Sequence, residues 1–162
     1  MNYYDNFYEG LNDNRNLLYR QIDTVSTMNK LLSTLYCEIY NLKNYKINVK
    51  GENSYTLKLQ LKEIIECFSF YENKIQELIK MKNGFPIYQV GDIESISSIK
   101  TLASMDYKVS TILNNLINEF KMIKSLINET ITNAQKENDY ITITTLSDLL
   151  YQINNFLLHY EL

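Results

Sequence analysis

The chain alternates between long stretches in which apolar residues recur every three or four positions and short joints that are polar or contain glycine. Apolar residues at this spacing lie on one face of an α-helix. Four such stretches are present, and we expect them to form four helices around one shared core. Their apolar positions are Met28, Leu32, Leu35, Ile39 and Leu42; Leu57, Leu61, Ile64, Phe68, Tyr71, Ile75 and Leu78; Leu102, Met105, Val109, Ile112, Leu116, Phe120, Ile123 and Ile127; and Ile143, Leu146, Leu150, Ile153, Leu157 and Tyr160.

The helix-breaking residues indicate where these helices are joined. Gly51 follows the first stretch, whereas Gly84, Pro86 and Gly91 cluster in the connection after the second. That connection is long, and residues 93–99 within it predict one or two further helical turns. A long crossover makes the second and third helices run parallel. The fold class predicted is therefore all-α, a four-helix bundle with a short helix in its crossover.

Residues 1–21 precede the bundle, which we assign to residues 22–162. Tyr4, Phe7, Tyr8 and Leu11 follow helical spacing in this extension. The pattern predicts an amphipathic helix that packs its aromatic face on the rest of the protein.

Composition narrows the range of functions. A chain of 162 residues with 45% hydrophobic and 22% charged residues is typical of one soluble domain. Its net charge of −3 argues against a polyanion as the main partner. Two cysteines, Cys37 and Cys67, are too few for a disulfide framework and lie in apolar helical patterns, so we expect buried free thiols. No leader-like or membrane-spanning apolar segment is evident, and a cytoplasmic location is expected.

Several short motifs occur in a defined order along the chain: MNKLL at 28–32, NYKINVKG at 44–51, NSYTLK at 53–58, NGFP at 83–86, and Asp139 with Thr142. In their order and separation they resemble the Dps miniferritins, the ferritin-like proteins that protect DNA during starvation. The resemblance covers about residues 28–160. It implies a ferritin-like bundle, a role in stress protection, and a homo-oligomeric shell of twelve subunits built from dimers.

The resemblance also implies an iron-oxidising site between two subunits, with a His, a second His twelve positions on, an Asp fifteen further and a Glu four after that. The same spacing falls on Lys46, Lys58, Asn73 and Glu77. Iron needs imidazole and carboxylate donors with free lone pairs. A protonated lysine has none, so these are degenerate ferroxidase positions. We expect no catalytic residue, no metal cofactor, and absent or very slow iron oxidation.

Other candidate iron sites are sparse. Many relatives carry acidic residues at three positions that hold Leu59, Lys62 and Glu63 here. Because only one of these three residues is acidic, mineral nucleation should be weak. Glu137 and Asp139 are a candidate acidic pore. The single histidine, His159, is expected to be a surface or interface residue.

Two interpretations remain for the polar residues of the second helix. The simpler one is a solvated helix face, formed by Lys58, Lys62, Glu66, Asn73 and Glu77. In the sharper one, Lys46 and Lys58 replace the metal electrostatically and pair with Glu77 across a two-fold interface. Lys46 lies four residues beyond Leu42, in the apolar series of the first helix, so its charge is expected to need a partner.

Three functions are therefore open. The first is a Dps-like shell protein without a ferroxidase centre, with a structural, protective or partner-binding role, which could co-assemble with an active relative. The second is an iron-storage protein that uses relocated acidic sites, namely Glu63, Glu66, Glu77, Glu137 and Asp139. The third is a helical adaptor without a shell.

Duplex DNA is expected to bind weakly or not at all. Several family members bind DNA through a basic N-terminal tail, but here Asp5, Glu9 and Asp13 outnumber Arg15 and Arg20 in the extension. Stacking of its tyrosines on single-stranded bases is an alternative to docking on the shell.

Overall fold

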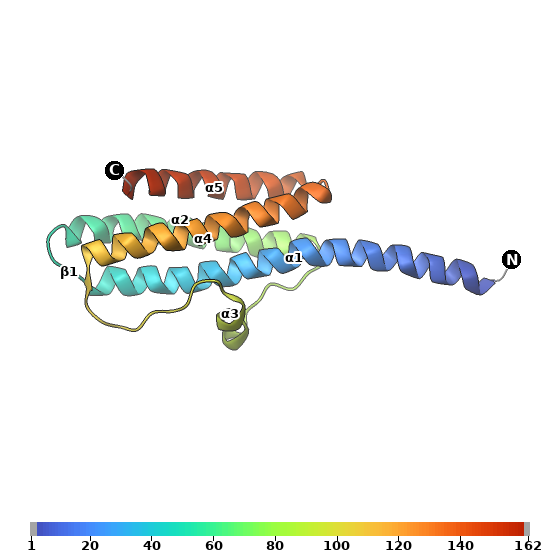
Figure 1. Ribbon diagram of the computed structural model, residues 1–162, viewed down its shortest axis with the longest axis horizontal. Coiled ribbons are helices and arrows are strands. Elements are labelled where there is room, and N and C mark those ends of the chain that lie inside the picture. Colours follow the sequence, from blue (N-terminus) through green and yellow to red (C-terminus); the bar gives the residue numbers. More distant parts are fainter. Residues whose placement is uncertain (1–2, 161–162) are drawn as a thin grey trace.

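The computed structural model describes the backbone of residues 3–160 and the side chains of residues 24–159. Four long helices form a bundle, and a fifth, short helix lies outside it against the first (Figure 1). This arrangement confirms the predicted all-α four-helix bundle with a short crossover helix. In chain order the elements are α1 (Tyr3–Asn48), β1 (Val49–Lys50), α2 (Ser54–Met81), α3 (Val90–Ile96), β2 (Tyr107–Lys108), α4 (Val109–Lys136) and α5 (Tyr140–Tyr160).

The proposed boundary between an extension and the bundle falls inside α1. The side chains of residues 1–21 lie outside those that the structure describes. The amphipathic packing of this extension therefore stays a prediction.

The crossover sets the direction of the helices. α1 packs mainly on α2, and α4 on α5, while α2 and α4 both begin at the end of the bundle where β1 lies (Figure 1). The two helices thus run parallel, as the long connection predicted. β1 and β2 pair in parallel, with Val49 opposite Tyr107. This pairing, which the sequence pattern did not reveal, fastens the end of α1 to the start of α4.

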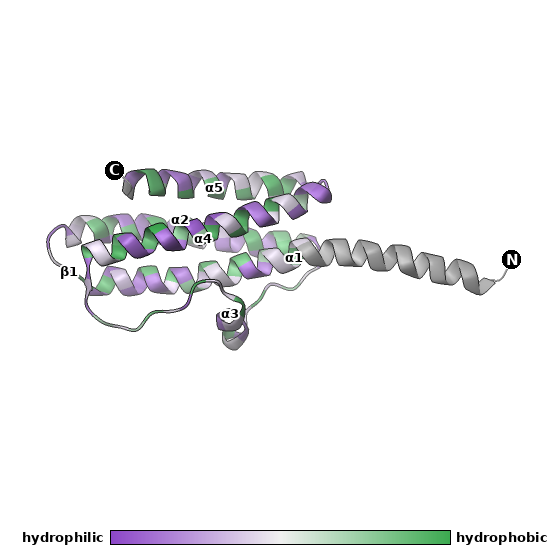
Figure 2. Cartoon of the chain, in the orientation of Figure 1, coloured by the Kyte–Doolittle hydropathy of each residue, from purple (hydrophilic) through white to green (hydrophobic). Residues whose placement is uncertain are grey.

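The core lies where the apolar stripes of the four long helices meet, and polar residues lie between these stripes (Figure 2). Phe120 of α4 lies at its centre, with ring centroids 5.5 Å from Phe68 of α2 and 6.2 Å from Phe156 of α5. Burying one such side chain stabilises the fold by about 1.5–3 kcal/mol. These aromatic contacts fix the register of three helices.

The sequence prediction of the third helix was wrong at its start. Leu102 and Met105 lie in the crossover, 36% and 59% exposed, and α4 begins only at Val109. The reason is that α1 supplies hydrogen bonds that hold the crossover in an extended form. The Asn41 amide donates to the Lys100 carbonyl (3.0 Å) and accepts from the backbone N–H of Leu102 (2.9 Å).

The short crossover helix is also displaced from its predicted range. α3 ends at Ile96, and the next residues turn inward instead of continuing the helix. Ser97 and Ile99 are buried, and the Ser97 hydroxyl donates to the Ile99 carbonyl. A serine side chain that bonds nearby backbone competes with helix formation in this way.

Candidate functional site

Lys46 and Lys58 lie close to the loop that joins α1 to α2. Lys46 is in the last turn of α1, and Lys58 is the fifth residue of α2. Both are half-buried, and neither ammonium has an ion-pair partner within the described part of the chain. The buried position beyond Leu42 belongs to Tyr45, which is fully buried, so Lys46 lies at the edge of the core and not within it.

Asn73 and Glu77 lie further along α2, on an exposed groove of about 690 Å³. The Asn73 amide donates to the Ser69 carbonyl (2.9 Å), one helical turn back. The Glu77 carboxylate pairs with Lys74 at 3.1 Å. The groove is lined by Asn73, Gln76, Glu77, Lys80, Met81, Pro86 and Tyr88.

These two pairs of residues are far apart in one chain. Fifteen residues of helix separate Lys58 from Asn73, which at 1.5 Å per residue is about 22 Å along α2. The four positions that the sequence pattern selected can therefore meet only if the first pair of one subunit faces the second pair of another. A single subunit presents two half-sites.

A hydrogen-bonded cluster beside the groove links α1 to α2. The Gln76 amide donates to the Tyr36 hydroxyl (3.0 Å) and to Glu72 (3.2 Å), and the Tyr88 hydroxyl donates to the Gln76 carbonyl oxygen (2.5 Å). Burial raises the pKa of Tyr36 far above its ordinary value, and the Glu72 charge raises it further. Tyr36 is thus a neutral phenol, and the cluster holds the crossover against α2 without supplying a base.

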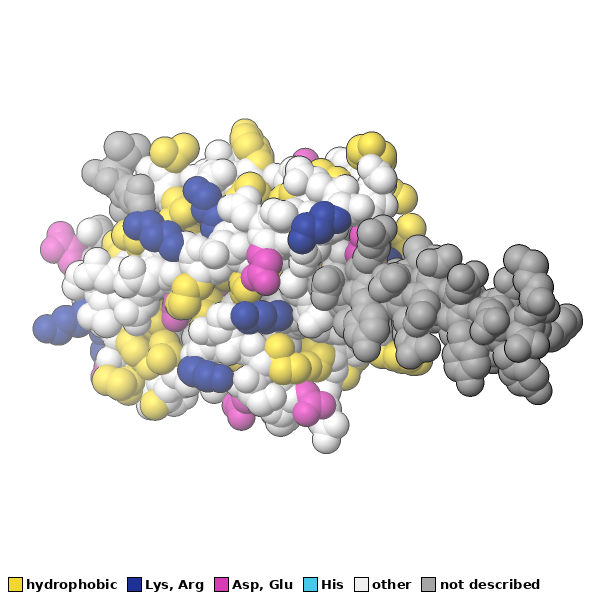
Figure 3. Space-filling model, turned by 45° about the vertical axis from the view of Figure 1, so that its right-hand side comes forward, with side chains coloured by type: hydrophobic (Ala, Val, Ile, Leu, Met, Phe, Trp, Pro, Cys, Tyr) yellow, Lys and Arg dark blue, Asp and Glu magenta, His cyan; other side chains and the backbone are white. Residues whose placement is uncertain are grey.

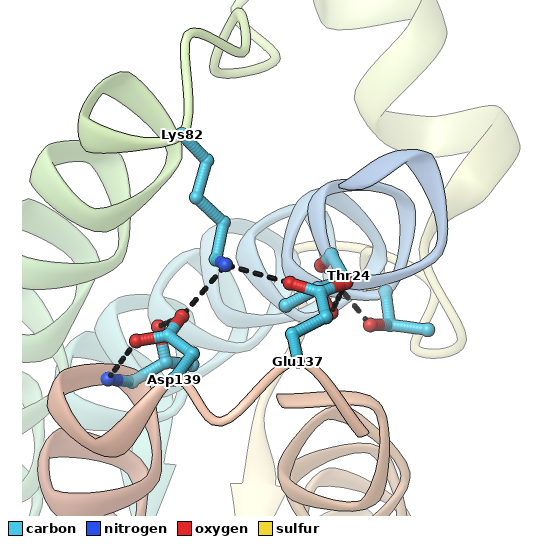
Figure 4. Close-up of polar contacts among 6 residues, drawn as sticks. Thr24, Lys82, Glu137 and Asp139 are labelled. Atoms are coloured by element: carbon cyan, nitrogen blue, oxygen red, sulfur yellow. Dashed lines mark hydrogen bonds and ion pairs between the residues drawn. The ribbon is translucent and has the colours of Figure 1, made fainter. Parts of the chain in front are cut away.

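The candidate acidic pore residues are paired with a lysine. The Lys82 ammonium contacts Glu137 at 2.7 Å and Asp139 at 2.8 Å, and the three side chains are only 12–16% exposed (Figure 4). Thr24 of α1 donates to the other oxygen of Glu137 (2.7 Å). The cluster joins α1, the end of α2 and the α4–α5 turn. Whether these carboxylates line a pore in an assembly stays a prediction. In the chain, the single positive charge of Lys82 offsets part of their negative charge.

Asp139 has a second function in this cluster, because it caps α5. Its carboxylate accepts from the Thr142 backbone N–H (3.1 Å) and from the Thr142 hydroxyl (2.5 Å). Burial opposes ionisation of Asp139, but the hydrogen bonds from Lys82 and Thr142 outweigh it and lower its pKa. Burial likewise opposes the charge of Lys82, but its two carboxylate partners raise its pKa overall.

The remaining candidates are dispersed. His159 is exposed near the end of α5 and lies 2.8 Å from Gln60, which fits the predicted surface position. Both cysteines are free; Cys37 is buried and Cys67 half-buried, and burial raises the pKa of the Cys67 thiol to about 11. Within the described residues, no three His, Cys, Asp or Glu side chains are grouped so as to hold a metal ion.

Sequence reasoning missed one buried pair. Glu38 of α1 is fully buried and Glu119 of α4 nearly so, and the two carboxyl groups lie close enough to influence each other's ionisation. A signal for them was present. Glu38 is three residues after Leu35, and Glu119 is three after Leu116, so both occupy positions of the apolar stripes.

The fold and the motif positions together define a ferritin-like protein. The sequence model of the ferritin-like domain family matches residues 25–158, and the chain therefore belongs to that family. No helix of the described residues has the length and apolarity needed to cross a membrane.

The relatives within the family are Dps miniferritins, which confirms the resemblance seen in the sequence. The DNA protection during starvation protein of Helicobacter pylori is 22% identical over 110 residues, 68% of this chain and 76% of that protein. The Dps protein of Bacillus brevis has a similar structure, with a TM-score of 0.84 and 18% identity over 88% of this chain and 95% of that one. The Dps protein of Vibrio cholerae gives a TM-score of 0.83 and 15% identity over 88% and 89% of the two chains.

Proposed function

We propose that the protein is a Dps-type shell subunit that lacks a functional ferroxidase centre and serves a structural, protective or partner-binding purpose. The carrying observation is the chemistry of the two half-sites. Lys46 and Lys58 bring ammonium groups where lone pairs are needed, and Asn73 brings a neutral amide that already bonds the Ser69 carbonyl. Only Glu77 has a ligand suited to iron. These residues do not fit an iron-oxidising site.

Exposed apolar residues near the groove support this proposal. Met81 and Tyr88 line the groove, and Phe85 and Val90 lie near them in the chain; all four are largely exposed although they are apolar or aromatic. Several exposed apolar residues beside a groove are typical of a protein interface. The Dps resemblance implies a dimer-based shell of twelve subunits, and this face carries one of the two half-sites that such a dimer would join.

An interface would also supply the missing partner for the lysines. Glu77 pairs with Lys74 in an exposed contact of the kind that contributes about 0–1 kcal/mol, so its carboxylate is readily available to a neighbouring subunit. Lys46 and Lys58 are half-buried and have no counter-ion among the side chains of residues 24–159. In the proposed dimer, their ammonium groups face Glu77 of a second copy and occupy the space of the metal.

The main alternative, iron storage at relocated acidic sites, has less support from the geometry. Glu63 and Glu66 are exposed on α2, whereas Glu137 and Asp139 are bound to Lys82. A storage site made from these residues needs contributions from several subunits. An adaptor without a shell is the third candidate, and native mass distinguishes it from the other two.

The test is anaerobic Fe(II) titration of the native assembly, followed by oxidation with peroxide and monitored by absorbance. We expect no fast, saturable phase at stoichiometric iron. The matched variant restores three ligands, Lys46→His, Lys58→His and Asn73→Asp, and should gain iron binding. A fast phase in the wild-type protein would overturn the proposal, and a monomer across micromolar concentrations would favour the adaptor.

A further inference from the structure

The bundle interior contains two carboxyl groups, those of Glu38 and Glu119, that are not part of the proposed function. Glu38 is fully buried and Glu119 is 8% exposed, and they approach each other from the facing helices α1 and α4. Neither forms a salt bridge with a lysine or arginine of the described residues. Two ionised carboxylates placed together without a cation would be strongly destabilising.

The hydrogen-bond geometry indicates what relieves this repulsion. Among the residues that the structure describes, no N–H or O–H donor reaches either carboxyl oxygen of Glu38, and Oε2 of Glu119 also lacks one. A carboxylate only accepts hydrogen bonds, so a bond between these two groups requires a proton on one of them. We propose that Glu38 and Glu119 share a proton at neutral pH, and that this proton fastens α1 to α4 as a pH-sensitive lock.

Among the described residues, no buried lysine or arginine lies beside the pair to supply a positive charge. The buried positions of α2 are apolar, with Tyr71 the only titratable side chain, and those of α5 carry no charge. On α1, Tyr45 interacts electrostatically with Glu119 and Glu38, but its hydroxyl is bound by the Asn115 amide of α4 (2.9 Å), and its ring packs on Tyr107 of β2. Tyr45 remains a neutral phenol, because burial raises its pKa far above the ordinary value.

The lock is connected to the crossover. The Asn41 side chain interacts with Glu119 and also holds the backbone of Lys100 and Leu102. Loosening of the carboxyl pair should therefore release both the α1–α4 contact and this part of the crossover.

The sign of the pH dependence follows from the pKa values. Burial raises the pKa of Glu119 to about 7, and burial together with the Glu119 charge raises that of Glu38 well above its usual range. In the unfolded chain both titrate near pH 4.3, as glutamates ordinarily do. The folded protein thus holds more protons than the unfolded chain above this pH. The stability that the pair contributes is greatest in acid. It falls as pH rises to about 7, where Glu119 loses its proton, and falls further when the proton that remains on the pair is lost.

The experiment is denaturant unfolding of the native assembly between about pH 5.5 and 8.5, for the wild type and Glu38→Gln/Glu119→Gln. For each proton held only by the folded state, the unfolding equilibrium constant rises up to about tenfold when the pH increases by one unit. We expect this rise in the wild type and a loss of most of it in the double variant, because an amide donates without a titrating proton. Glu129→Gln, which changes an exposed glutamate of α4, is the matched control and should retain the wild-type slope.

Two further measurements make the test decisive. At neutral pH, the infrared band of a protonated carboxyl group should be present in the folded wild type and in Glu129→Gln, and absent in the double variant. Absence of this band from the wild type would overturn the proposal, even if the double variant failed to fold. Equal slopes in the wild type and the double variant would also overturn it. If added Mn²⁺ abolished the pH dependence of unfolding in the wild type but not in the other variants, the pair would bind a divalent cation in place of a proton.

Discussion

Lys82 provides the sharpest test of how this fold is held together. Its ammonium lies 2.7 Å from Glu137 and 2.8 Å from Asp139, with all three side chains mostly buried. At this distance and an effective dielectric constant near 20, the gross attraction is about 6 kcal/mol per pair, most of it offset by loss of hydration. Replacement Lys82→Met leaves two carboxylates close together without a cation. We expect the free energy of unfolding to fall by about 3 kcal/mol near neutral pH.

The assay is denaturant unfolding at several pH values. The Asp139 pKa is lowered in the folded state, so its contribution is fully present above the unfolded value of about 3.9 and is lost as pH falls through the folded pKa. The Lys82 pKa is raised, so its contribution persists to about pH 10.4 and is lost above that. The cost of Lys82→Met should thus be largest between these limits and shrink in acid. Lys74→Met is the control, because its exposed pair with Glu77 should cost less than about 1 kcal/mol.

A triple variant separates charge from packing. In Lys82→Met/Glu137→Gln/Asp139→Asn the unpaired charges are removed while the Asn side chain can still cap α5. Most of the lost stability should return. If Lys82→Met alone were as stable as the wild type at pH 7, or if its cost did not change with pH, the reasoning from this buried cluster would be refuted.

Two further predictions concern the surfaces of the subunit. Glu77→Ala should weaken the proposed dimer by about 3 kcal/mol in sedimentation equilibrium, because two lysines lose their counter-ion. The control Glu66→Ala, on the same helix, should have little effect. An intact Glu77→Ala dimer with an unchanged melting temperature would support a plain solvated helix face. Duplex DNA should not be retarded in a gel shift at about 150 mM salt, because the net charge is −3 and the lysines on the face in Figure 3 are interspersed with acidic, apolar and neutral side chains. Persistent retardation would contradict this.

The helices were predictable from the sequence because burial of one apolar stripe per helix dominates their formation. Leu57 to Leu78 marked α2 correctly, and the glycine and proline cluster marked the crossover. The start of α4 was not predictable in this way. Leu102 and Met105 continue the helical spacing by coincidence, and the crossover there is fixed by Asn41, about sixty positions earlier in the chain. Such long-range hydrogen bonds leave no local periodic signal.

Sequence motifs identify candidate positions but say little about their surroundings. The family resemblance selected Lys46, Lys58, Asn73 and Glu77 and implied that two subunits share them. It did not show which of these side chains already have partners within one chain. Nor did the pattern predict that Lys82 would pair with both carboxylates of the candidate acidic pore. Charge pairing between distant elements depends on the completed fold, and for this reason sequence spacing carries little information about it.

The two lysines also change what the proposed interface depends on. A metal ion that balances carboxylates between subunits is exchangeable, so the stability of such an interface varies with the supply of the metal. The ammonium groups of Lys46 and Lys58 are covalently part of the chain and cannot be lost by exchange. On the proposed function, an interface with lysine at these positions holds its charge balance whether or not iron is present. In the proposed shell, the lysines that would prevent iron oxidation would therefore be compatible with an intact interface.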